Sequence, residues 1–172
     1  MSVHISYHFN YPKDLRGLAA DINTWIGCNL SPYDGNELDS YYARFLGMEF
    51  SLRSAEGYVN DGELDLENFS YQLGFRTPVP DAGMRPTQLP AILVVVYALH
   101  HSLGITGMLV YEVESLLARY VEREIDGYGR RLFDVLSETP FISFPAHLNI
   151  VRKRLRESWQ NFYGDSPVSP ED

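Results

Sequence analysis

The sequence predicts a single α+β domain in which a four-stranded antiparallel sheet carries helices on one face. Four short segments alternate apolar and polar side chains with the two-residue period of a half-buried strand. Between them lie segments with the three-four spacing of apolar residues that is typical of helices. The order is strand, helix, strand, strand, helix, strand, followed by further helices. This is the β-α-β-β-α-β order of ferredoxin-like folds, here with extra C-terminal helices.

The N-terminal segment contains the clearest strand and helix. From Val3 to Asn10 apolar residues alternate strictly with polar ones, which predicts a strand with one buried side. Asp14 is a suitable N-cap for the helix that follows, and Gly27 is a suitable residue to end it. We also expect a short helix over residues 38–46.

Two further strands are predicted from Gly47 to Arg53 and from Phe69 to Thr77, because both segments alternate in the same way. The connection between them is long and acidic, with a tight turn expected at Asn60-Asp61-Gly62. The segment from Pro78 to Pro86 contains three prolines and a glycine, so it is expected to be irregular.

The segment from Thr87 to Leu103 is ambiguous, since its β-branched run is typical of a strand. It is too long for a usual strand, and Gly104 suits a helix end, so we expect a helix that is buried nearly all round. A fourth strand over Gly107 to Val113 and an amphipathic helix from Leu116 to Ile125 follow.

A last helix is expected from Ala146 to Phe162. Two prolines and three acids follow Gly164, which is typical of a disordered tail. The predicted organisation is therefore one α+β domain over residues 1–163 and a tail over residues 164–172.

Composition indicates a cytoplasmic protein with a protein partner. The 172 residues carry a formal net charge of −9. This charge opposes binding to the phosphate backbone of nucleic acids and favours attraction to a basic protein. The N-terminus lacks the pattern of a signal peptide, and the run from Leu89 to Leu99 is about half the length of a membrane span. A single cysteine, Cys28, excludes an internal disulfide.

Acidic residues are concentrated in the connection between the second and third predicted strands. They are Glu56, Asp61, Glu63, Asp65 and Glu67. Such a cluster is either a solvated loop or a surface that recognises a basic partner, and the sequence leaves both open. The glycine and the closing glutamate are not at the offsets of a calcium loop, so no metal is expected here.

No catalytic motif is present. The chain has neither a Gly-x-Ser-x-Gly elbow nor a glycine-rich phosphate loop. Cys28 follows a helix end, where the negative pole raises the pKa of a thiol instead of lowering it. We therefore expect a protein that is not an enzyme and that uses no cofactor.

The polar side of the predicted sheet offers an alternative site, formed by His4, His8, Gln72 and Arg76. The two histidines are four residues apart on a strand, roughly 13 Å, which is too far for them to share one metal ion. The aromatic residues of these strands face the core, which argues against the base-stacking surface of RNA-recognition modules. Two hypotheses remain for this side: a small-molecule or enzymatic site, and a homodimer that buries it.

Four stretches of the chain resemble small bacterial immunity proteins of polymorphic toxin systems. These stretches are Phe45–Leu52, Asn60–Leu66, Phe69–Arg76 and Met108–Val113. The resemblance implies a non-enzymatic cytoplasmic protein that neutralises a toxin domain by covering its active site. Nuclease toxins have basic clefts, so an acidic protein suits that role.

Overall fold

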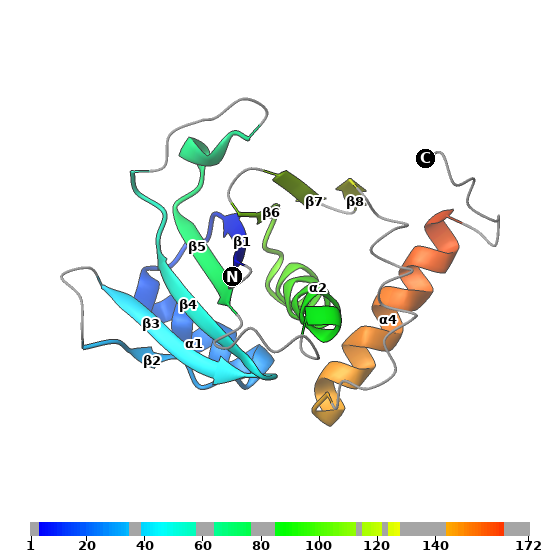
Figure 1. Ribbon diagram of the computed structural model, residues 1–172, viewed down its shortest axis with the longest axis horizontal. Coiled ribbons are helices and arrows are strands. Elements are labelled where there is room, and N and C mark those ends of the chain that lie inside the picture. The colour runs from blue at the N-terminus through cyan, green and yellow to red at the C-terminus, as the bar shows by residue number, and fades with distance from the viewer. Residues whose placement is uncertain are drawn as a thin grey trace.

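The computed structural model describes residues 4–34, 39–57, 64–76, 85–112, 115–121, 124–127 and 144–163. Its centre is an eight-stranded antiparallel sheet with the strand order β2-β3-β4-β5-β1-β6-β7-β8 (Figure 1). The strands are β1 (His4–Phe9), β2 (Ser31–Pro32), β3 (Ser40–Phe45), β4 (Met48–Ser54), β5 (Tyr71–Arg76), β6 (Gly107–Tyr111), β7 (Ser115–Val121) and β8 (Glu124–Gly127). The helices are α1 (Leu15–Ile26), α2 (Arg85–Leu103), α4 (Ala146–Tyr163) and the short 3₁₀ helix η1 (Leu66–Asn68).

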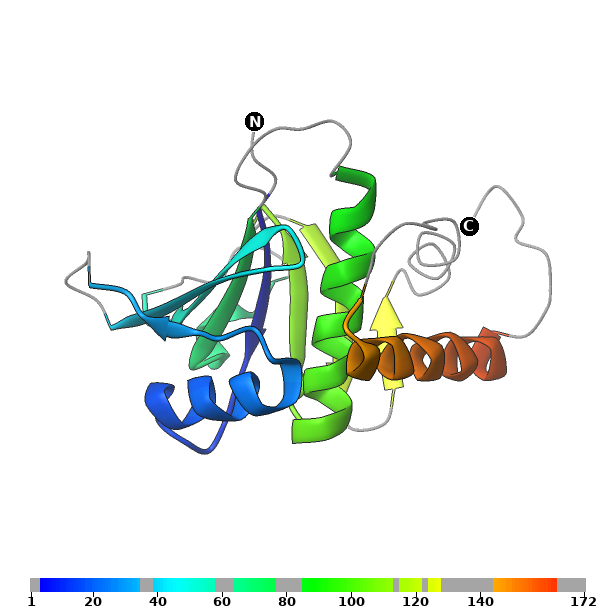
Figure 2. The same ribbon diagram turned by 90° about the horizontal axis from the view of Figure 1, so that it is seen from below.

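The three α-helices lie on one side of the sheet. The sheet curves around α2, while α1 lies against β4 and α2, and α4 packs on the outer side of α2 (Figures 1 and 2). Side chains at alternate positions of β1, such as Tyr7 and Phe9, meet the helices in one large hydrophobic core. Every residue from Ala91 to Leu99 is buried, which confirms the prediction of a helix that is buried nearly all round.

Local signals at the ends of α1 are also confirmed. The Asp14 carboxylate accepts a hydrogen bond from the Gly17 backbone N–H at 2.7 Å and thus caps the N-terminus of the helix. Gly27 ends the helix with a φ of 75°, in the left-handed region that glycine adopts without a Cβ penalty. Trp25, in the last turn of this helix, is 50% exposed.

The prediction of a four-stranded ferredoxin-like sheet was wrong. The four predicted strands correspond to β1, β4, β5 and β6, and they lie in the order β4-β5-β1-β6. The sheet continues beyond β4 with β3 and β2, and beyond β6 with β7 and β8. As a description of the fold class, only the general term α+β agrees with the expectation.

The short helix expected over residues 38–46 is replaced by β3. Phe45 pairs with Met48, so Leu46 and Gly47 form a two-residue hairpin turn. Their φ values are 51° and 74°, and two consecutive positive φ angles are the signature of a type I′ turn. The alternation of Tyr41 and Ala43 with their polar neighbours fits this strand.

The amphipathic helix expected from Leu116 to Ile125 is also wrong, because this segment forms β7 and β8. Leu109 pairs with Ala118, but the next residue, Val110, pairs with Leu116. A β-bulge therefore inserts Leu117 into the strand and breaks its two-residue period. The interrupted alternation has the spacing of a helix, which explains the wrong prediction.

Several expectations fall outside the described residues. They are the tight turn at residues 60–62, most of the irregular segment at residues 78–86 and the tail at residues 164–172. The helix predicted near the C-terminus is confirmed as α4, which ends one residue later than expected.

Candidate functional site

The side of the sheet that faces away from α1 and α2 is polar, and we call it the polar face. Strand register arranges its side chains in three rows that cross the strands. The first row is Arg44, Glu49, Arg76 and His4; the second is Tyr42, Ser51, Gly74 and Ser6; the third is Ser40, Arg53, Gln72 and His8. Neighbouring rows are two residues apart along each strand, or roughly 6.6 Å. The four residues predicted as an alternative site thus lie in the first and third rows.

One end of the polar face is covered. Leu64 and Leu66, from the connection between β4 and β5, pack with Met108 and Val110 of β6 in a second, smaller hydrophobic cluster. His8, at the end of the third row, is fully buried as a consequence. The polar side of β1 is therefore not an open surface.

A chain of hydrogen bonds runs along the third row. The Arg53 Nε–H donates to the Gln72 Oε1 atom at 2.6 Å. The Gln72 Nε2 atom lies 3.4 Å from His8 Nε2, which in turn lies 3.0 Å from the Ser6 hydroxyl. Gln72 and Ser6 are themselves buried, so these hydrogen bonds connect the Nε atom of Arg53 to the protein interior. Burial, together with the charges of Arg53 and His4, lowers the pKa of His8 to about 4.

The other end of the polar face is open and contains a pocket of about 530 Å³ over β3 and β4. Among the described residues that line it, Arg44, Arg53 and Arg76 are basic and Glu49 is acidic. Arg44 is held by Tyr42, whose hydroxyl accepts from Arg44 Nε at 3.3 Å, and by Glu49 at 3.4 Å. Basic side chains thus outnumber acidic ones among the described lining residues, in a protein whose net charge is −9.

His4 lies beside Arg76, one of the arginine residues of this pocket, in the strand register. Its ring lies against Gly74, where a Cβ atom would be 3.1 Å from His4 Nε2. Burial, followed by the charge of Arg53, lowers the pKa of His4 below its ordinary value, and Arg76 acts in the same direction. His4 and Arg76 are opposite each other in the register of β1 and β5, so the predicted pair is brought together at the rim of the pocket.

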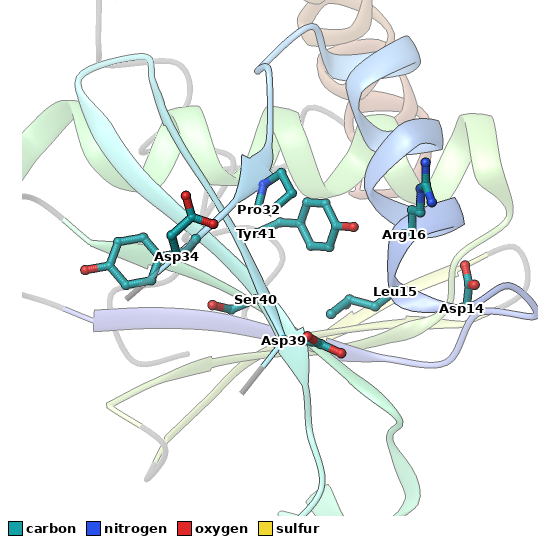
Figure 3. A pocket seen from close by; sticks show the side chains of 9 residues that line it. Asp14, Leu15, Arg16, Pro32, Asp34, Asp39, Ser40 and Tyr41 are labelled. Carbon is teal, nitrogen blue, oxygen red and sulfur yellow. The ribbon is translucent and has the colours of Figure 1, made fainter. Parts of the chain in front are cut away.

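A second pocket, of about 420 Å³, lies on the opposite side of β3, beside the start of α1. Asp14, the N-cap of α1, and Arg16 line it from one side, while Asp39, Ser40 and Tyr41 line it from β3 and the residue before it (Figure 3). Asp14 already serves as the N-cap of α1. No group of three or more His, Cys, Asp or Glu side chains within the described ranges could hold a metal ion.

The acidic connection between β4 and β5 is only partly described. Glu56, Asp65 and Glu67 are exposed, whereas Asp61 and Glu63 lie outside the described residues. Leu64 and Leu66 alternate with these acids and are buried, so this part of the connection is fixed on the sheet while its carboxylates face solvent. We call Glu56, Asp65 and Glu67 the acidic edge.

Two other expectations concern reactivity and membranes. Cys28 is buried, and burial raises the pKa of its thiol to about 11, so it is a poor nucleophile at neutral pH. Among the described helices, none combines the length and apolar character needed to cross a bilayer.

The sequence reasoning identified Arg76 but missed Arg44, Arg53 and Ser51, which line the same pocket. Ser51 and Arg53 fall at alternate positions of the predicted strand Gly47–Arg53, opposite its apolar residues, so the alternation contained the signal. Arg44 was hidden because its segment was expected to be a helix. Comparisons of this chain with protein-family models, with curated proteins and with solved structures give no match.

Proposed function

We propose that the protein acts by binding a basic protein partner through its acidic edge, and that the partner is a toxin domain that it neutralises in the cytoplasm. The observation that supports this most strongly is the alternation of exposed acids with buried leucines in residues 64–67. A surface that is already ordered before binding loses less conformational entropy when a partner associates.

The charge of the chain supports the same proposal. A net charge of −9 attracts a basic partner over several ångströms and increases the rate of encounter, most strongly at low salt. The resemblance to immunity proteins implies that this partner is a toxin domain. Toxins that cleave nucleic acids have basic clefts, which an acidic protein can bind. In this mode no catalytic residue is required of the present chain.

The test is co-expression with the toxin domain encoded by the gene next to that of this chain. We expect growth to be restored and a stable complex to appear in size-exclusion chromatography with light scattering. Replacing Glu56, Asp65 and Glu67 by Lys changes the net charge from −9 to −3 and should weaken binding by about tenfold or more at low salt.

A matched control reverses three other exposed acids, Asp34, Asp39 and Glu157, and gives the same net charge. Equal losses in both triple variants would mean that net charge alone matters and would overturn the assignment of the acidic edge. A neighbouring toxin domain that is neither bound nor neutralised would contradict the proposed function. Light scattering of the chain alone tests the separate hypothesis of a homodimer.

A further inference from the structure

A third pocket lies on the polar face, where β6 begins and β7 ends. Its volume is about 310 Å³, at the lower end of the range of small-molecule sites, so it suits a ligand with a short body. We call it the apolar pocket, because apolar side chains predominate among the described residues that line it. These residues are Phe69, Thr106, Gly107, Met108, Arg119, Tyr120 and Val121.

Strand register brings the main side chains of this pocket together. Met108 of β6 lies opposite His8 of β1 on one side and opposite Arg119 of β7 on the other, so it extends the third row of the polar face. Val121 is two residues beyond Arg119 on the same strand and therefore points to the same side of the sheet. Phe69 reaches the pocket from the segment just before β5.

The pocket combines a fixed floor with exposed apolar walls. Met108 is 6% exposed and belongs to the second hydrophobic cluster, against which Phe69 packs. Val121, in contrast, is 44% exposed, and Phe69 is only partly buried. The apolar part of a ligand that covers these two side chains removes their surface from water, which is favourable.

Arg119 is the one charged residue among the described residues that line the apolar pocket. It is partly buried and forms no ion pair with any residue in the described part of the chain. Its guanidinium can donate two parallel hydrogen bonds to one carboxylate. Apolar neighbours such as Met108 and Val121 reduce the access of water to that contact, which strengthens it. The pocket therefore offers an apolar surface beside a cation.

The remaining charge of the protein works against anion binding, which makes the position of Arg119 informative. The net charge is −9, and Glu67 of the acidic edge lies only two residues before Phe69. These acids attract a cationic ligand and repel an anionic one. A preference of the apolar pocket for an anion would therefore have to come from Arg119 itself.

We propose that the apolar pocket binds a small amphipathic carboxylate of the fatty-acid type. Its alkyl chain lies against Phe69, Met108 and Val121, and its carboxylate is bound by the guanidinium of Arg119. This adds a ligand site to a protein that we propose to act by binding another protein. Because the pocket adjoins the acidic edge, its tests use the chain alone, and their outcome does not depend on a toxin partner.

The first test is isothermal titration calorimetry at neutral pH and low salt with octanoate, octylammonium and acetate. We expect octanoate to bind saturably, with a dissociation constant of about 1 mM or lower. Octylammonium has the same chain with the opposite charge, and acetate has the carboxylate without the chain. Each should bind at least about tenfold more weakly than octanoate. The proposal is overturned if octanoate does not bind or if octylammonium binds as tightly.

Variants at Arg119 test the contact with the carboxylate. Arg119→Gln should weaken octanoate binding by about tenfold, which corresponds to about 1.4 kcal/mol, and should not weaken the binding of octylammonium. Arg154→Gln is the matched control, because it removes one positive charge from an exposed position on α4. It should leave octanoate binding unchanged. Equal losses in the two variants would mean that general charge attraction explains the binding, and would contradict the assigned site.

A variant at Val121 tests the contact with the alkyl chain. Val121→Thr keeps the branched shape that suits a strand but replaces a methyl group by a hydroxyl. It should weaken octanoate binding by about threefold and leave the preference for octanoate over octylammonium in place. Circular dichroism checks that each variant folds. Wild-type affinity for octanoate in folded Val121→Thr and Arg119→Gln would place the ligand elsewhere and overturn the proposal.

Discussion

The guanidinium of Arg53 donates through Nε to the side-chain oxygen of Gln72 at 2.6 Å. A guanidinium has only donors, so this contact requires the Gln72 oxygen to face Arg53 and its NH₂ group to face His8. The Gln72 Nε2 atom is 3.4 Å from His8 Nε2. His8 Nε2 must then be an acceptor, which places the ring proton on Nδ1. A surface arginine thereby sets the tautomer of a buried histidine.

Acid should destabilise the protein through His8. The pKa of this residue is lowered from 6.5 to about 4 in the folded state, so between these values the unfolded chain binds a proton that the folded chain does not. The free energy of unfolding should be highest above pH 6.5 and should decrease by about 3 kcal/mol as the pH falls to 4. Urea unfolding across this range measures the decrease.

His8→Gln supplies the control for this prediction, because an amide can hydrogen bond at the same site without titrating. Carboxylates affect the pH dependence of the unfolding free energy equally in wild type and variant. The difference between the two proteins therefore reports the contribution of His8. If the unfolding free energies of wild type and His8→Gln decreased in parallel from pH 7 to 4, the lowered pKa of His8 would be contradicted.

A side chain at Gly74 should disturb the floor of the polar face. A Cβ atom there would lie 2.7 Å from Ser51 Oγ and 3.1 Å from His4 Nε2. Both neighbours are side chains that can move, so we expect Gly74→Ala to cost about 1 to 2 kcal/mol in unfolding free energy.

Gly107→Ala is the matched comparison, since Gly107 lies on the adjacent part of the same sheet. There a Cβ atom would collide with the backbone carbonyl of His8, which cannot rotate away. We expect a cost of about 3 kcal/mol or more. If the Gly74 variant were the less stable of the two, the proposed difference between mobile and fixed neighbours would be wrong.

Removing the side chain of His147 should loosen the attachment of α4. Its Nε2 atom is 2.8 Å from the carbonyl oxygen of Ile26, the last residue of α1, and it must donate because a carbonyl only accepts. His147→Ala should lower the unfolding free energy by about 1 kcal/mol, and His147→Gln should recover part of it. Denaturant unfolding of both variants tests this, and equal stability of the alanine variant and wild type would contradict it.

Alanine at any position in the middle of α2 should be costly. Leu93, Val94, Val95 and Val96 point in four directions about 100° apart, and all four are fully buried. Each substitution should destabilise the protein by about 1 to 4 kcal/mol. Arg16→Ala on the exposed side of α1 should change stability by less than about 0.5 kcal/mol. A tolerated alanine among the four would identify a side of α2 that is not packed.

The parts of the fold that could be predicted depend on neighbouring residues. Asp14 and Gly27 mark the ends of α1 because capping involves backbone groups only a few residues away. The buried helix α2 could be recognised because a long run of apolar residues has no polar side. The four strands with unbroken alternation were found for a similar reason.

The edges of the sheet could not be predicted in the same way. A bulge at Leu117 interrupts the period of β7, and its position depends on how β7 pairs with β6. β3 lies next to the sheet edge and joins β4 through a two-residue turn at Leu46-Gly47, where a non-glycine residue adopts positive φ. Without these strands the predicted sheet has only four strands, and Arg44 is not placed on its polar side.

The sequence by itself determined the two-residue rhythm that places His4, His8, Gln72 and Arg76 on one side of the sheet, because that rhythm is a property of each strand alone. Only the tertiary structure decided that His8 and Gln72 are buried while Arg76 remains exposed. That difference arises because Leu64 and Leu66 fold back over one end of the polar face, against residues of β6 that are more than forty positions away in the chain. Contacts between residues so far apart in the chain produce no periodic pattern in the local sequence.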